Sequence, residues 1–114
     1  MQILDIARAV VDALEDKKGE DILLLDLLNV ASFTDYFIIC NGTSERMLTS
    51  LAETAQMAAK SKFGIQARIE GQPMDGWLLV DLGDVVVHLV TPEQRDYYDL
   101  ENLWEHGKVL LRVK

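Results

Sequence analysis

The stretch Gly76–Val90, GWLLVDLGDVVVHLV, constrains the fold of this chain more than any other part of the sequence. Two apolar runs flank a central DLGD, which is typical of a β-hairpin closed by a two-residue turn at Leu82-Gly83 or Gly83-Asp84. Side chains alternate between the faces of a strand, so both turns divide the residues in the same way. One face is wholly aliphatic and the other is mixed: Leu78, Val80, Leu82, Val85, Val87 and Leu89, against Trp77, Leu79, Asp81, Val86, His88 and Val90.

The aliphatic face of the hairpin must belong to a core packed under helices. The mixed face is largely apolar, yet it carries an indole, an imidazole and a carboxylate. Two interpretations stay open for it. It is either a half-exposed apolar surface that serves an interaction, or a surface covered by the tail or by another loop.

The rest of the chain predicts an order of elements α-β-β-α-β-β-β-α. An amphipathic helix begins near Ile3 and ends with Gly19 as its C-cap, and a second helix follows the capping hydroxyl of Ser44 and ends at Gly64. Strands are expected at 21–28, 36–40 and 65–70, ahead of the hairpin. The fold class is therefore α/β, an α+β sandwich with a mixed β-sheet and helices on one face.

The segment after the hairpin predicts a third helix that runs to about Glu105. Thr91 and Pro92 provide an N-cap and a first helical residue, and Gln94 would complete a capping box. Helical spacing assigns one set of side chains to the core: Tyr97, Leu100, Leu103 and Trp104. Tyr98 projects to the opposite side, beside Arg95, and should meet water.

Length and composition indicate one domain. The chain has 114 residues, of which 49% are hydrophobic, so residues 1–105 are expected to form a single domain. Residues 106–114 are a tail that is either an edge strand or a mobile end. The formal charge of −8 disfavours broad contact with phosphate backbones and favours a basic protein partner.

The single cysteine and the absence of long apolar runs bear on location. Cys40 cannot build a disulfide framework, and a reducing cytoplasm is expected. No run approaches the roughly 20 apolar residues of a membrane helix.

The sequence offers little that resembles a catalytic or metal site. Asp81 and Asp84 flank a tight turn, where Asp commonly bonds to the local backbone. His88 is expected to pack or to lie at a rim. No zinc-protease or nucleophile-elbow motif occurs, so catalytic residues, metal and cofactor are all expected to be absent.

Several blocks, in order, resemble the Iojap-type ribosomal silencing factors: KKGEDILLLDL, SFTDYFIICNGTSERM, IEG, GWLLVDLGDVVVHLV and RDYYDLENLW. The resemblance runs from the first helix to Trp104 and leaves out the tail from Glu105. It implies a fold similar to nucleotidyltransferases without their catalytic carboxylates. It also implies a protein that binds the large ribosomal subunit through ribosomal protein L-fourteen, blocks association with the small subunit and so represses translation.

The resemblance also implies a docking surface. The family uses a Trp at the start of the hairpin and a Tyr on the last helix, which correspond here to Trp77 and Tyr98. The division of faces extends this set to the further partner-binding candidates Met74, Leu79, His88 and Arg95. A free homodimer is compatible with the resemblance, but the pattern of residues does not establish it.

Two alternatives belong to other classes of protein. One is a small nucleotidyltransferase-like enzyme that uses Ser44 and the Asp81/Asp84 pair with magnesium. The other is a plain homodimerisation module whose apolar sheet face pairs with itself. Nucleotide turnover that depends on magnesium would identify the enzyme, whereas co-sedimentation with large subunits would identify the silencing factor.

Overall fold

A computed structural model describes residues 2–28, 34–100 and 107–113, and the structural statements below concern these residues. The elements follow the predicted order, with a short 3₁₀ turn and a last strand in addition. They are α1 (Ile3–Asp16), β1 (Glu20–Asp26), β2 (Tyr36–Asn41), α2 (Glu45–Phe63), β3 (Arg68–Gln72), η1 (Pro73–Asp75), β4 (Trp77–Asp81), β5 (Val85–Val90), α3 (Pro92–Tyr98) and β6 (Lys108–Val113).

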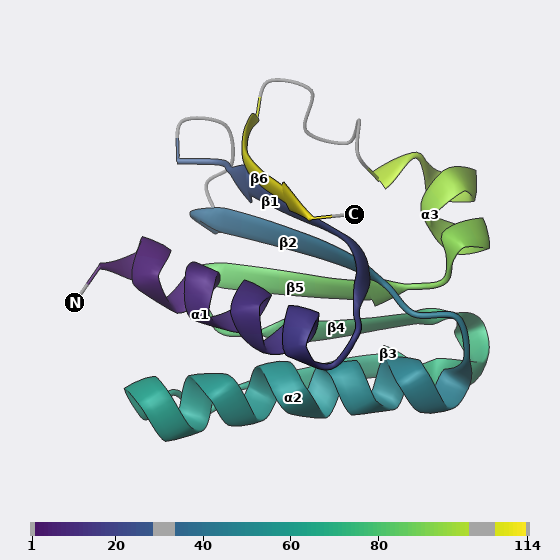
Figure 1. The fold of residues 1–114 in the computed structure, drawn as a ribbon, viewed down its shortest axis with the longest axis horizontal. Helices are drawn as coiled ribbons and strands as arrows, with labels where there is room; N and C mark the ends of the chain where they lie inside the picture. Colours follow the sequence, from purple (N-terminus) through teal and green to yellow (C-terminus); the bar gives the residue numbers. More distant parts are fainter. Residues whose placement is uncertain (1, 29–33, 101–106, 114) are drawn as a thin grey trace.

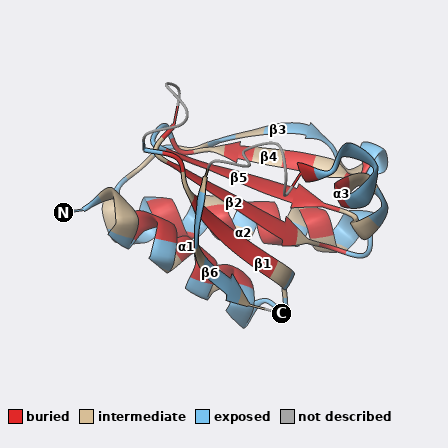
Figure 2. Cartoon of the chain, turned by 90° about the horizontal axis from the view of Figure 1, so that it is seen from above, coloured by how far each residue is buried: buried red, intermediate tan, exposed pale blue. Residues whose placement is uncertain are grey.

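The six strands form one mixed sheet in the order β3-β4-β5-β2-β1-β6 (Figure 1). The central pair, β2 and β5, is parallel, and the other neighbouring strands are antiparallel. The predicted α+β class with a mixed sheet is confirmed. Figure 2 shows the consequence for burial, since the central strands are buried and the edge strands β3 and β6 are largely exposed.

The hairpin β4–β5 has the predicted division of faces, and its turn is at Gly83-Asp84. The Leu82 N–H donates to the Val85 carbonyl at 2.9 Å, and Gly83 has a φ of 90°, which suits glycine at the first loop position. The aliphatic side chains of the hairpin are all buried in the main core, under α1 and α2: Leu78, Val80, Leu82, Val85, Val87 and Leu89.

Two of the three α-helices in the described part of the chain cover one face of the sheet. In Figure 1, α1 and α2 lie side by side on that face, whereas α3 lies beyond the end of the sheet where β5 finishes. The hydroxyl of Ser44 caps α2 by accepting from the Met47 N–H at 3.1 Å, and Gly64 ends the helix in the left-handed region, both as predicted. The expectation of helices on one face therefore holds for α1 and α2 alone.

The end of α1 differs from the prediction that Gly19 caps it. Lys17 is the C-cap and Lys18, with a φ of 67°, takes the left-handed conformation. Gly19 serves close packing, because a Cβ at this position would lie 2.6 Å from the Sγ of Cys40. A Cβ at position 19 would therefore force Cys40 or its surroundings to shift.

The mixed face of the sheet is buried over β5 and half-exposed over β4, so the half-exposed surface expected on this face is limited to β4. Val86, His88 and Val90 are all buried, and Trp77 and Leu79 are partly buried against the same second cluster. Leu100, which follows α3, is fully buried in this cluster. Three of the exposed large apolar side chains of the described residues lie on η1 and α3, namely Met74, Tyr97 and Tyr98, and the others lie at Leu28, Met57, Val109 and Leu111.

The last helix is shorter than predicted. It ends at Tyr98, and Asp99 adopts a left-handed conformation with a φ of 49°. Because the helical period stops here, Tyr97 is 76% exposed and the prediction that it belongs to the core is wrong, whereas Leu100 is buried as predicted. Leu103 and Trp104 lie outside the described residues.

The tail contributes an edge strand. β6 pairs antiparallel with β1, so residues 108–113 belong to the same sheet as the rest of the chain. Among the described residues, none of the helices is long and apolar enough to cross a membrane.

Candidate docking surface

Four large side chains gather where η1, β4 and α3 meet, and we call them the aromatic patch: Met74, Trp77, Tyr97 and Tyr98. Met74 is 75% exposed, Tyr97 76% and Tyr98 52%, while Trp77 is partly buried. The ring centroids of Trp77 and Tyr98 are 5.2 Å apart, and Tyr97 meets Tyr98 edge-on at 4.8 Å. A surface cluster of Trp, Tyr and Met side chains has the composition of a protein-binding surface.

A hydrogen bond to the buried side chain of His88 orients the indole of Trp77. Its indole Nε1–H donates to Nδ1 of His88 at 2.9 Å. The imidazole in turn stacks at a tilt on Phe37, with 4.2 Å between ring centroids. Burial lowers the pKa of His88 to about 4, so near neutral pH the ring is uncharged and Nδ1 can accept this bond.

A shallow hollow of about 420 Å³ lies beside the aromatic patch, lined by Met74, Asp75, Trp77, Gln94 and Tyr98. The predicted capping box is only half formed. The Thr91 hydroxyl accepts from the Gln94 N–H at 3.3 Å, but the Gln94 amide donates to the carbonyl of Asp75 at 3.1 Å. This bond ties the start of α3 to η1, so the two sides of the hollow are linked.

The sequence predicted that Arg95 lies beside Tyr98 on the exposed side of α3, but the structure buries it. Its side chain is 3% exposed, and Nη1 donates to the Asp21 carbonyl at 2.6 Å and to Oδ1 of Asn41 at 2.7 Å. The side chain of Arg95 thus reaches from α3 to the start of β1 and the end of β2.

The structure therefore divides the predicted partner-binding residues into two groups. Met74, Trp77 and Tyr98 lie together at the surface, whereas His88 and Arg95 are buried beneath it and Leu79 packs against the second cluster. Tyr97 joins the patch, although the sequence assigned it to the core. The signal that could have found it is Asp99, because Asp adopts the left-handed conformation that ends a helix more readily than most residues do.

The residues of the enzymatic alternative do not converge. Asp81 Oδ1 accepts from the Gly83 N–H at 2.8 Å, as the turn interpretation predicted. Ser44 follows β2, whose end is level with Val90, whereas Asp81 pairs with Val86 at the other end of β5. Within the described ranges, no group of three or more His, Cys, Asp or Glu side chains is placed to hold a metal ion.

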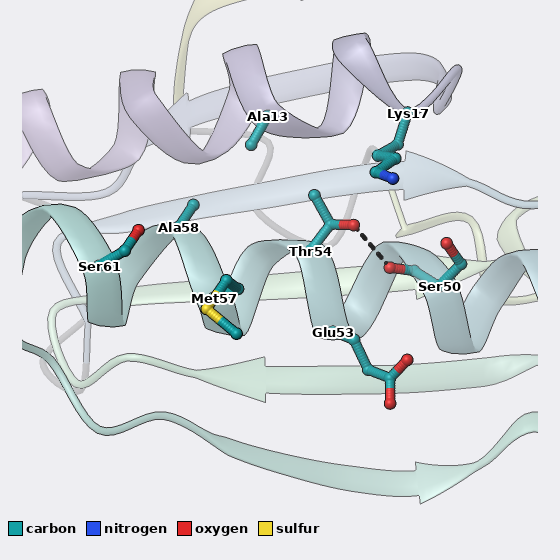
Figure 3. A pocket seen from close by; sticks show the side chains of 8 residues that line it. All are labelled: Ala13, Lys17, Ser50, Glu53, Thr54, Met57, Ala58 and Ser61. Carbon is teal, nitrogen blue, oxygen red and sulfur yellow. Dashed lines mark hydrogen bonds between the residues drawn. The ribbon is translucent and has the colours of Figure 1, made fainter.

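A second hollow lies between α1 and α2 and has a volume of about 460 Å³. Figure 3 shows its lining, which has one lysine, one carboxylate, one methionine and small or hydroxyl-bearing side chains: Ala13, Lys17, Ser50, Glu53, Thr54, Met57, Ala58 and Ser61. The Thr54 hydroxyl already donates to the Ser50 carbonyl at 2.8 Å. This hollow has no aromatic side chain and no convergent catalytic set, so the aromatic patch is the stronger candidate.

Comparison with known proteins gives a consistent result. The model of the RsfS family, described as "Ribosomal silencing factor during starvation", matches residues 1–113. The ribosomal silencing factor RsfS of Bacillus subtilis is 45% identical, over 90% of this chain and 84% of that protein. A mouse protein named "Mitochondrial assembly of ribosomal large subunit protein 1" is 36% identical over 83% of this chain, which spans 43% of its length.

The fold is similar to that of a solved structure over most of both chains. A crystal structure of a Chromobacterium violaceum protein has a TM-score of 0.86 and 42% identity, and the match covers 92% of this chain and 88% of that one. The matched range of the family model includes β6, so the tail that the sequence blocks left out belongs to the match. The resemblance drawn from those blocks is confirmed: the chain belongs to the ribosomal silencing factor family, RsfS.

Proposed function

We propose that this protein docks on the large ribosomal subunit with its aromatic patch, binds ribosomal protein L-fourteen there, and keeps the small subunit from joining. The observation that carries the proposal is the pair Trp77 and Tyr98. In this member of the ribosomal silencing factor family the two rings are in contact at the surface, with 5.2 Å between their centroids. Trp and Tyr are the residues most enriched among binding hot spots.

The charge around the patch supports a basic protein as the partner. Four exposed carboxylates lie on η1, α3 and the residue that follows α3: Asp75, Glu93, Asp96 and Asp99. The one cationic side chain of α3, Arg95, points inward and is buried. An acidic rim around an apolar centre speeds encounter with a basic protein and disfavours contact with ribosomal RNA.

The proposed mechanism is steric. A domain bound to a protein on the joining side of the large subunit occupies space that the small subunit needs, and no chemical step is required. Magnesium-dependent nucleotide turnover that Asp81→Asn abolishes would contradict this mechanism.

An order-of-addition experiment tests the mechanism. The protein is added either to separated subunits before joining or to preformed, translating ribosomes, and peptide synthesis is measured in both cases. We expect strong inhibition in the first order and little in the second. Equal inhibition in the two orders would show that the protein acts after joining, and a steric block would then be wrong.

A further inference from the structure

The position of α3 needs an explanation, because the helix cannot hold itself in place. It has seven residues, about two turns, and helices this short are marginal in water without tertiary contacts. Arg95 is the only buried side chain of α3, and no apolar residue of the helix is buried. The start of α3 is tied to η1 through Gln94, and Arg95 supplies the one buried side chain that anchors the helix which carries Tyr98.

Those contacts reach two different strands. Nη1 of Arg95 donates to the Asp21 carbonyl of β1 and to the Asn41 side chain of β2, at 2.6 and 2.7 Å, and Nη2 lies 3.8 Å from the Asp21 carboxylate. β1 and β2 are neighbours in the sheet, and Asp21 lies in the irregular start of their pairing. The planar guanidinium has the rigid geometry to bridge both strand ends at once.

Asp21 is shaped for this contact. It has a φ of 45°, which turns its carbonyl out of the regular ladder, and such a conformation persists only where the surroundings hold it. Its carboxylate also accepts from Nε and Nη2 of Arg112 on β6, both at 3.1 Å. The same aspartate thus connects the edge strand β6 to the helix of the aromatic patch.

We propose that Arg95, held by Asp21 and Asn41, is the positioning residue that sets Tyr98 against Trp77 for docking. The inference rests on the proposed function and deepens it. Arg95 does not touch the partner. It acts by fixing α3 at the end of the sheet, three residues before the ring that does.

Two variants test the role of the anchor. Arg95→Met removes the guanidinium but keeps an unbranched side chain, and it leaves Asp21 paired with Arg112. Asp21→Asn removes the shared carboxylate, and Asn tolerates a left-handed conformation. Thermal unfolding confirms that each variant is folded, and the second variant serves if the first is not.

The first readout is made on the free protein. In wild type, nuclear Overhauser cross-peaks between the ring protons of Trp77 and Tyr98 are expected, because their centroids are 5.2 Å apart. Folded Arg95→Met should lose or weaken these cross-peaks, and Asp21→Asn should weaken them. Wild-type cross-peaks in both variants would overturn the proposal without any reference to the ribosome.

The second readout is large-subunit binding in a double-mutant cycle. Arg95→Met should weaken binding by about tenfold or more, and adding Tyr98→Ala to it should cost less than about threefold further, because residues that act as a unit are not additive. Fully multiplicative losses would mean that Arg95 has a general structural role, and the proposal would fail. If Tyr98→Ala alone leaves binding unchanged, the proposed docking surface is wrong, whereas loss in Tyr98→Ala with wild-type binding in Arg95→Met rejects only the positioning role.

Discussion

The indole of Trp77 donates a hydrogen bond to Nδ1 of His88 at 2.9 Å, so a surface residue of the aromatic patch is oriented by a buried imidazole. The two residues are diagonal neighbours on the β4–β5 hairpin, since Trp77 pairs with Val90 and His88 with Leu79, and both lie on the side away from the main core. The bond requires an unprotonated Nδ1. Any condition that protonates His88 at Nδ1 must therefore remove the hydrogen bond that orients Trp77.

This arrangement predicts a specific loss of stability in acid. The pKa of His88 is lowered by burial to about 4 from 6.5, so between these values the unfolded chain binds more protons than the folded one. The contribution of neutral His88 to the free energy of unfolding is complete above about pH 6.5 and is lost as the pH falls through 4. Its full size is on the order of 3 kcal/mol.

Urea unfolding of wild type and His88→Gln at pH 7 and pH 4.5 measures the effect. Glutamine can still accept from the indole but does not titrate in this range. Wild type should lose about 2 kcal/mol more than the variant over this interval. An identical loss in both proteins would show that His88 does not titrate abnormally.

Substitutions in the main core are expected to lower stability and to leave binding unchanged. Leu78 is 3% exposed and Val87 is fully buried, on the face of the hairpin opposite Trp77. Leu78→Ala should lower the free energy of unfolding by about 2–4 kcal/mol through cavity formation, and Val87→Ala by about 1–3 kcal/mol. Both variants, while folded, should bind large subunits as wild type does. Denaturant unfolding with co-sedimentation checks this, and a loss of binding without a loss of stability would reverse the assignment of faces.

Much of the fold could be predicted because hydrophobic patterning is local. The alternation in Gly76–Val90 fixes which side chains enter the core, and the hydroxyl of Ser44 and the position of Gly64 mark the ends of α2. The patch residues Trp77 and Tyr98 were predicted from the family resemblance and from their positions on a strand and a helix. These are properties of short segments, which a sequence displays directly.

Two of the errors depend on contacts between distant parts of the chain, and the third concerns the local end of α3. Arg95 was predicted to face water, but it is buried against Asp21, a residue far away in sequence. The helical period predicted that the helix containing Tyr97 runs to about Glu105, whereas α3 ends at Tyr98. Gly19 was expected to cap α1, but the close approach of Cys40 is what favours a glycine at this position.

The end of α1 allows a simple stabilising change. Lys18 is a non-glycine residue with a φ of 67°, a conformation that costs L-residues free energy and glycine little. Lys18→Gly should therefore raise the free energy of unfolding by about 0.5–1 kcal/mol. Lys18→Ala keeps the strained conformation and serves as the control. Destabilisation by the glycine would show that the lysine side chain contributes more than the strain costs.

The central claim, that the aromatic patch is the docking surface, is tested most directly by co-sedimentation with isolated large ribosomal subunits. The variants are Trp77→Ala and Tyr98→Ala, with Met57→Ala as the matched control, since Met57 is a 61% exposed apolar side chain in the hollow between α1 and α2. Each patch variant should weaken binding by about 2 kcal/mol or more, roughly 30-fold in Kd, and Met57→Ala should bind as wild type does. Wild-type binding by folded Trp77→Ala and Tyr98→Ala, together with loss in Met57→Ala, would place the docking surface on the helical face and contradict the account.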